Sequence, residues 1–129
     1  MQKLEQFILV YYSLLFLGFG IAAMILPDTM SGLVHFGLTN AVANIEYMAT
    51  YGGLFIGLAF YMLYCVTGNA VSGLVCVLLT MGGMFIARIT GYLLYKDLDT
   101  LQGIYLAGEL FTMVLIALVL CKGKKIHAS

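Results

Sequence analysis

Charge is scarce in this sequence. Only 9% of its 129 residues are Asp, Glu, Lys or Arg, where a soluble domain carries about 25%, and hydrophobic residues make up 63%. The formal net charge is zero, so the chain has no electrostatic basis for binding nucleic acid. The composition therefore predicts an integral membrane protein whose main partner is the lipid bilayer, and the length favours one domain over residues 1–129.

Cysteine and histidine are also few. The three cysteines, Cys65, Cys76 and Cys121, form no CxxC pair and fall inside apolar runs. This argues against a thiol-based membrane reductase and favours free thiols used as small hydrophobic side chains. The two histidines, His35 and His127, lie in a loop and in the C-terminal tail, where they cannot ligate a haem between helices. We expect no metal site and no other cofactor.

Four segments are apolar and long enough to cross a bilayer core of about 30 Å. They lie at residues 7–26, 47–66, 70–95 and 101–121, and Pro27 ends the first. A short polar turn after the third segment makes the last two helices antiparallel. The pattern predicts an all-α fold, an integral membrane four-helix bundle with up-down topology.

The segment at 28–46 separates the first two apolar runs. It is too polar to span a membrane and too apolar to be a free linker. Asp28 suits an N-cap position at its start. We expect a short helix at the membrane interface; the alternative is a segment that folds back over one end of the bundle as a lid.

The lysines predict the orientation in the membrane. Four of them gather on one side: Lys3, Lys122, Lys124 and Lys125. The other side carries one lysine and four acidic residues: Lys96, Asp28, Glu46, Asp97 and Asp99. Because positive residues favour the cytoplasmic side, both termini are predicted to be cytoplasmic.

Two charged residues lie deep in apolar runs, Arg88 in the third and Glu109 in the fourth. The turn at 96–100 places them about 10 Å and about 12 Å from the same end of the bundle, at 1.5 Å per residue. Intramembrane charges usually pair or mark a functional site, so we predict an Arg88–Glu109 ion pair. The pair serves either a function or only the register of two helices. The alternative is that Glu109 carries a proton and cycles it.

Other polar side chains approach the same half of the membrane. Gln102, Tyr105 and Thr112 share one helix face with Glu109, because the four positions follow 3-4-3 spacing. With Arg88 they predict a buried polar pocket or network. Neighbouring helices add Asn44, Glu46, Tyr51 and Tyr92. For Glu46, helix capping is favoured over chemistry, and the tyrosines also fit interfacial aromatic belts.

Small residues recur along the second and third apolar runs, mostly four positions apart, and such residues let helix backbones approach closely. This spacing indicates packing rather than chemistry. It fits contacts within the bundle and contacts with another copy of the chain. The residues are Gly52, Gly53, Gly57, Gly83, Ala87 and Gly91.

Three stretches together resemble a known family. They are Asn44-x-Glu46-Tyr47-x3-Tyr51-Gly52-Gly53-Leu54-Phe55-Ile56-Gly57-Leu58, Ala87-Arg88-x2-Gly91, and Gly108-Glu109-Leu110 after an acidic turn. The pattern resembles the small four-helix bacterial membrane proteins grouped as domain of unknown function 4345, over nearly the whole chain. The resemblance implies a multi-pass protein of the bacterial cytoplasmic (inner) membrane and brings no established activity. The residues it would carry over are Tyr51, Gly52, Gly53, Arg88, Gly91 and Glu109.

Three functions remain open on these residues. The one we favour is a non-enzymatic module that binds a lipid-like or quinone-like ligand, or a larger membrane complex, through the polar pocket. The second is a small proton-coupled transporter that works as a homo-oligomer with Glu109 as the carrier. The third is an integral membrane enzyme acting on a lipid, with Glu109 or Glu46 as acid or base, although no nucleophile–base set completes it.

Overall fold

The computed structural model describes residues 2–96 and 100–127, with side chains from Lys3 to Lys122 within these ranges. Asp97 and Asp99 of the predicted turn, and the side chains of Lys124 and Lys125, lie outside this description. The described elements are all helical. In chain order they are α1 (Gln2–Ile25), α2 (Pro27–Leu33), α3 (Ala41–Tyr47), the π-helical segment η1 (Met48–Gly53), α4 (Leu54–Thr67), α5 (Ala70–Tyr95) and α6 (Thr100–His127).

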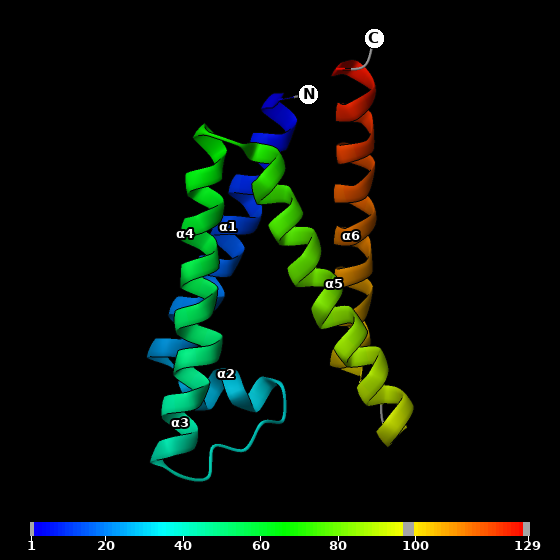
Figure 1. The fold of residues 1–129 in the computed structure, drawn as a ribbon. Helices are drawn as coiled ribbons and strands as arrows, with labels where there is room; N and C mark the ends of the chain where they lie inside the picture. The colour runs from blue at the N-terminus through cyan, green and yellow to red at the C-terminus, as the bar shows by residue number, and fades with distance from the viewer. Residues whose placement is uncertain (1, 97–99, 128–129) are drawn as a thin grey trace.

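Four helical stretches in the described residues are long and apolar enough to cross a membrane. α1 supplies the first, α3, η1 and α4 together supply the second, and α5 and α6 supply the other two. They run alternately up and down, and both termini lie at one end (Figure 1). The predicted fold, a helical multi-pass membrane bundle, is confirmed.

The third span has the predicted bounds, because both of its ends carry local signals. Asn69 caps its start, where Oδ1 accepts a hydrogen bond from the Ser72 N–H at 3.2 Å. At the other end Lys96 adopts a left-handed conformation with φ 52° and donates its N–H to the Tyr92 carbonyl at 2.7 Å. These signals are short-range, which is why the sequence locates the helix well.

A short helix lies between the first two spans, as predicted, but the segment 28–46 does not form one unit. Asp28 is not the cap, because α2 begins at Pro27, whose fixed φ suits a first helical position. α3 continues directly into η1 and α4. Its cap is Asn40, whose Oδ1 accepts from the Ala43 N–H at 2.9 Å. The second span therefore begins at Ala41 rather than at Tyr47.

α1 crosses the second span at a contact between two glycines. A Cβ added to Gly20 would lie 2.9 Å from the carbonyl oxygen of Gly52 and 2.8 Å from Cγ1 of Ile56. Gly52 belongs to η1, and π-helical segments of this kind are rare insertions in α-helices, often near functional sites. Backbone meets backbone here, so the contact sets the position of the neighbouring Tyr51.

Tight packing is concentrated in the half of the bundle that carries the termini. One core cluster joins α1, α4, α5 and α6 in this half: Ile8, Leu9, Tyr12, Phe16, Ala59, Met62, Cys65, Leu74, Val77, Ile116 and Val119. From this end α4 and α5 diverge (Figure 1). The opposite half, which holds Arg88 and Glu109, is consequently less closely filled.

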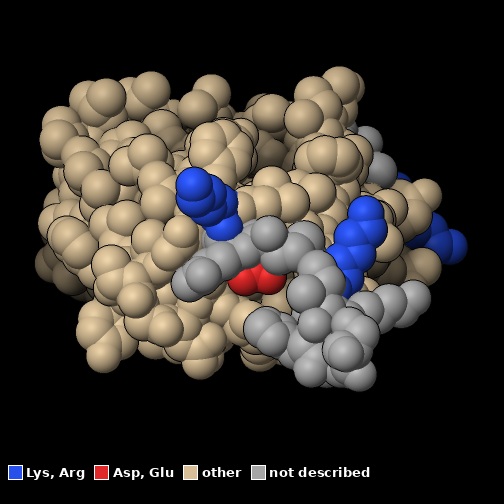
Figure 2. Space-filling view, turned by 90° about the horizontal axis from the view of Figure 1, so that it is seen from above, with Lys and Arg blue, Asp and Glu red and all other residues tan. Residues whose placement is uncertain are grey.

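Figure 2 looks onto the end of the bundle that carries the termini. A few charged side chains stand out there from a surface of mostly uncharged residues. Lys3 near the start of α1 and Lys122 in the last turns of α6 belong to this end and are exposed. Lys96, which follows α5, belongs to the opposite end.

Candidate functional site

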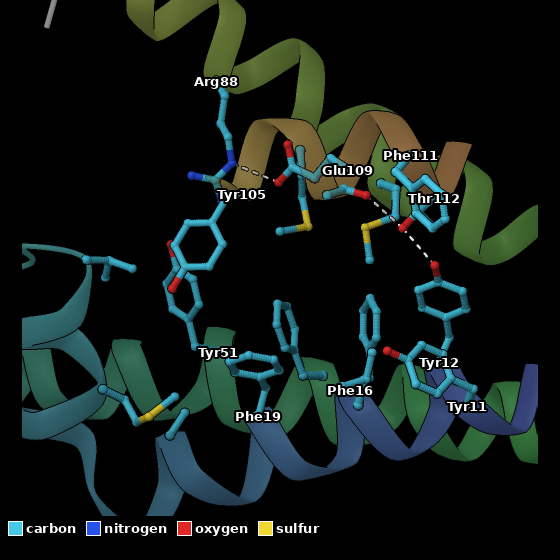
Figure 3. Close-up of a pocket in the computed structure, with 18 of the residues that line it drawn as sticks. Tyr11, Tyr12, Phe16, Phe19, Tyr51, Arg88, Tyr105, Glu109, Phe111 and Thr112 are labelled. Atoms are coloured by element: carbon cyan, nitrogen blue, oxygen red, sulfur yellow. Dashed lines mark hydrogen bonds and ion pairs between the residues drawn. The ribbon is translucent and has the colours of Figure 1, made fainter. Parts of the chain in front are cut away.

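A cavity of about 680 Å³ lies between α1 and α6 and extends along α1 from Phe7 to Ala23 (Figure 3). Its volume falls in the range of small-molecule sites, about 300–1,000 Å³. α5 and the second span complete the walls, and α2 contributes Met30 and Leu33. Most of the lining is apolar, and its charged groups are Arg88 and Glu109.

Arg88 on α5 is held by three side chains of α6. Its Nε donates a hydrogen bond to Glu109 Oε1 at 2.7 Å, which forms the predicted ion pair. Its Nη1 donates to Gln102 Oε1, and the guanidinium carbon lies 5.0 Å from the centre of the Tyr105 ring, a cation–π contact. The three partners share one face of α6, so a single helix compensates and orients the arginine.

Glu109 is more deeply buried than its partner. Its side chain is 5% exposed, against 23% for Arg88. Oε1 accepts from Arg88, whereas Oε2 is buried and has no hydrogen-bond partner among the described residues. A buried polar atom left unpaired is costly, so this oxygen is a position where a donor from a bound molecule would be favourable.

An aromatic ladder forms one wall of the cavity. Tyr47 and Tyr51 stack with ring centres 4.8 Å apart. Tyr51 lies 6.1 Å from Phe55, and Phe55 lies 5.1 Å from Phe16 of α1. In Figure 3 the Tyr51 ring points from this wall toward Tyr105. The ladder extends an apolar, ring-lined surface from the Arg88 end toward the core.

The cavity also opens sideways, along the gap between α1 and α6. Phe111 of α6 is 67% exposed and lies on the far side of the cavity from α1 (Figure 3). Since both helices are long enough to span a membrane, this opening faces the hydrocarbon of the bilayer. Four large side chains on α1 line the opening at intervals of four residues and stay partly exposed: Phe7, Tyr11, Leu15 and Phe19.

A hydrogen bond joins α1 to α6 between two residues of the cavity lining. The Tyr12 hydroxyl and Thr112 Oγ1 are 2.8 Å apart. The Thr112 hydroxyl donates to the Gly108 carbonyl at 2.8 Å, and a threonine has only one hydroxyl proton. Tyr12 must therefore be the donor to Thr112, and it also belongs to the core cluster.

Replacing Tyr12 by phenylalanine should lower the free energy of unfolding by about 0.5–1.5 kcal/mol. The change removes this hydrogen bond but leaves Thr112 with its backbone acceptor, so no buried donor is stranded. Unfolding in detergent would measure the loss. Tyr11→Phe is the matched control and should change nothing, because Tyr11 is 52% exposed and makes no hydrogen bond within the described chain. Equal stabilities of the two variants would contradict the role given to Tyr12.

The structure brings part of the predicted polar pocket together. The residues that meet at one end of the cavity are Arg88, Glu109, Gln102, Tyr105 and Tyr51. Tyr51 and Tyr105 place their rings in the lining, and Gln102 reaches the site through Arg88.

Asn44, Glu46 and Tyr92 do not join this group. The Asn44 side chain turns back on its own helix and donates to the Asn40 carbonyl at 3.3 Å. Glu46 is exposed within α3 rather than at a helix start, so the predicted capping role is wrong. Tyr92 is 44% exposed, on the part of α5 that diverges from α4. These residues were expected near the depth of Arg88 but do not face the cavity.

Of the small residues predicted to pack helices, some lie at a helix contact and others face open space. Gly52 packs against α1, where an added Cβ would meet Met24. Ala87 is exposed. Gly20 and Gly73 are packing glycines that the spacing missed, and Gly73 lies against Leu9. An added Cβ would meet nothing within 4 Å at Gly53, Gly57, Gly83 and Gly91.

Sequence patterns also do not single out the aromatic walls. The signal that could reveal them is recurrence every four residues, at 47, 51 and 55 and again at 7, 11, 15 and 19. In a membrane span nearly every position is hydrophobic, so this recurrence does not distinguish the aromatic positions from the other apolar ones. Only the distances between rings separate the wall from the rest of the apolar surface.

The site combines a few polar groups with a largely apolar lining. It has guanidinium donors, one unpaired carboxylate oxygen and phenol hydroxyls at the end of an apolar channel. Within the described residues, no group of three or more His, Cys, Asp or Glu side chains could hold a metal ion. The arrangement suits an amphipathic molecule with its polar end at Arg88.

Comparison with known proteins gives one finding. The family model described as "Domain of unknown function (DUF4345)" matches residues 4–120. Neither a curated protein nor a solved structure shows a significant match. The family resemblance drawn from the sequence is thereby confirmed, and the chemistry of the site has to be argued from its geometry.

Proposed function

Because the chain belongs to the family described as a domain of unknown function, DUF4345, we propose its function from the cavity: it is a non-enzymatic membrane protein that binds a lipid-like or quinone-like molecule. The polar end of the ligand lies at Arg88 and Glu109, and its apolar part lies along the aromatic ladder. Such a module acts alone or as an accessory of a larger membrane complex.

The observation that carries this proposal is the buried Oε2 of Glu109, which has no partner among the described residues and belongs to a side chain lining a cavity of about 680 Å³. A site that served only to fix helix register would pair its buried polar atoms internally. Here Arg88 satisfies one carboxylate oxygen and leaves the other. A bound head group supplies the missing partner.

Filling the cavity should abolish binding without weakening the fold. Gly108 lines the cavity, and an added Cβ there would meet nothing within 4 Å, so Gly108→Leu places a side chain in the ligand's space. We expect a stoichiometric lipid or quinone adduct on the wild-type protein released from nanodiscs, and at least tenfold less adduct on Gly108→Leu, a loss of about 1.4 kcal/mol of binding. Native mass spectrometry measures both.

Gly103→Leu is the matched control for this experiment. Gly103 lies on the same helix, outside the cavity lining, and an added Cβ there also meets nothing within 4 Å. Both substitutions change helix propensity alike, so Gly103→Leu should retain the adduct. A bare wild-type protein, or equal adducts on both variants, would remove the support for a ligand site.

We also propose that the protein lies in the bacterial cytoplasmic membrane with both termini in the cytoplasm. The support is the exposed pair Lys3 and Lys122 at the end that carries the termini, because lysines favour the cytoplasmic side of short loops and tails.

A proton-coupled transporter is the second candidate, and the same unpaired Oε2 of Glu109 favours it, since a carboxyl proton could occupy that oxygen. Copies could meet through the open glycine faces of α4 and α5, which carry Gly57 and Gly83. Proton flux into liposomes that Glu109→Gln abolishes, in the absence of any bound adduct, would favour this function over ligand binding.

A further inference from the structure

We propose that the cavity selects a ligand with an uncharged head that both donates and accepts hydrogen bonds, joined to a single apolar tail. Quinols and monoacylglycerols carry such a head, whereas anionic phospholipids do not. This inference rests on the proposed function and adds to it the chemical class of the ligand.

The first support is the charge balance at the polar end of the cavity. Arg88 and Glu109 carry opposite unit charges, and their Nε and Oε1 atoms are 2.7 Å apart. No other charged side chain of the described residues lines the cavity. A charged head would therefore bring an uncompensated charge into a largely dehydrated site, which is strongly unfavourable. An anionic head would in addition face the carboxylate of Glu109.

The second support is the set of hydrogen-bonding groups that remain unused. Glu109 Oε2 is buried and needs a donor. Arg88 uses Nε and Nη1, and its Nη2 has no partner among the described residues, so it can donate to an acceptor. A ligand hydroxyl meets both needs, because its proton can go to Oε2 while its oxygen accepts from the guanidinium.

The tyrosine hydroxyls at this end strengthen the same preference. Tyr51 and Tyr105 line the cavity, and neither hydroxyl has a hydrogen-bond partner in the described chain. A phenol hydroxyl is uncharged and can donate or accept. Each hydroxyl can therefore pair with either a donor or an acceptor on an uncharged head group. It cannot neutralise the charge of an ionic head group.

The third support is the shape of the apolar part. From the Arg88 end the cavity follows the ladder of Tyr51, Phe55 and Phe16 and continues along α1 as far as Phe7. Its side opens to the bilayer between α1 and α6. One channel between two neighbouring helices suits one tail, and the ligand can enter sideways from the membrane without passing through water.

Competition between matched lipids tests this class. The wild-type protein in nanodiscs would be offered monooleoylglycerol, oleoyl lysophosphatidic acid and oleoyl lysophosphatidylethanolamine, which share a chain and differ in the head. Decylubiquinol is the fourth probe and supplies an uncharged quinol head in place of the glycerol head. Native mass spectrometry counts the molecules retained. We expect monooleoylglycerol or decylubiquinol to bind at least about tenfold more tightly than lysophosphatidic acid, and the tighter of the two identifies the source of the head.

Glu109→Gln should remove most or all of the preference for the uncharged head. The variant keeps the size of the side chain but leaves the Arg88 charge uncompensated, so lysophosphatidic acid should gain at least about tenfold relative to monooleoylglycerol. Tyr92→Phe is the control, because Tyr92 is outside the cavity lining, and it should keep the wild-type order. If Glu109→Gln does not fold, the order on the wild-type protein still decides the question.

Two outcomes would overturn the inference in different ways. Equal or tighter binding of either lysophospholipid to the wild-type protein would overturn it and leave the proposed function standing. No saturable binding of any of the four probes would contradict the proposed function itself, and the inference with it.

Discussion

The Arg88→Met variant should lose about 3–5 kcal/mol of its free energy of unfolding, because it leaves the carboxylate of Glu109 buried without its counter-charge. Glu109 is 5% exposed and already has one unpaired oxygen. Removing Arg88 would leave both carboxylate oxygens without the partner that now pairs with Oε1. Reversible unfolding in mixed detergent micelles measures the loss.

The double variant Arg88→Met, Glu109→Leu separates the structural role of the pair from the functional one. Replacing a buried ion pair by apolar side chains is often neutral or stabilising, so the double variant should recover most of the stability that Arg88→Met loses. It should not recover the ligand adduct, because both polar partners of the head are gone. A double variant as unstable as the single one would contradict the pairing argument, and one that still binds ligand would contradict the site.

Gly20→Ala should destabilise the fold by about 1–3 kcal/mol, the usual effect of overpacking. Its Cβ would lie 2.9 Å from the Gly52 carbonyl oxygen and 3.1 Å from the Ile56 backbone nitrogen. Neither atom can move without shifting the helix, so α1 must separate from the second span. The separation would also move Tyr51, which adjoins Gly52, and we expect weaker ligand binding together with the lower unfolding free energy.

Gly18→Ala is the matched control for this prediction. Gly18 lies on the same helix, and a Cβ there meets nothing within 4 Å. The substitution should leave the stability unchanged or raise it by up to about 1 kcal/mol through helix propensity. If Gly20→Ala and Gly18→Ala unfold alike, the glycine crossing does not hold the two helices together.

The cavity and the core share one side of α1. Ile8, Tyr12 and Phe16 belong to the core cluster and also line the cavity. The charged groups of the cavity, Arg88 and Glu109, lie outside that cluster, in the half where α4 and α5 diverge. The packing that holds the helices together therefore also fixes one wall of the cavity.

The Arg88–Glu109 pair could be predicted from the sequence. A short turn joins the two helices, so depth follows from counting residues along each one, and the pair forms as predicted. Asn44, Glu46 and Tyr92 were assigned by similar depth and do not line the cavity. Depth alone does not decide which way a side chain faces.

The sequence by itself determined the all-helical membrane architecture, the bounds of α5 and the ion pair between the last two helices. These follow from composition, from the extent of each apolar run and from the register across one turn, all of which act over short distances along the chain. Only the tertiary structure decided that Gly20 and Gly52 are crossing glycines while Gly53 and Gly57 are open, and that the cavity lies between α1 and α6. Those features depend on the rotation and crossing of helices that are distant in sequence, and in a span where almost every residue is apolar the hydrophobic pattern does not specify that rotation.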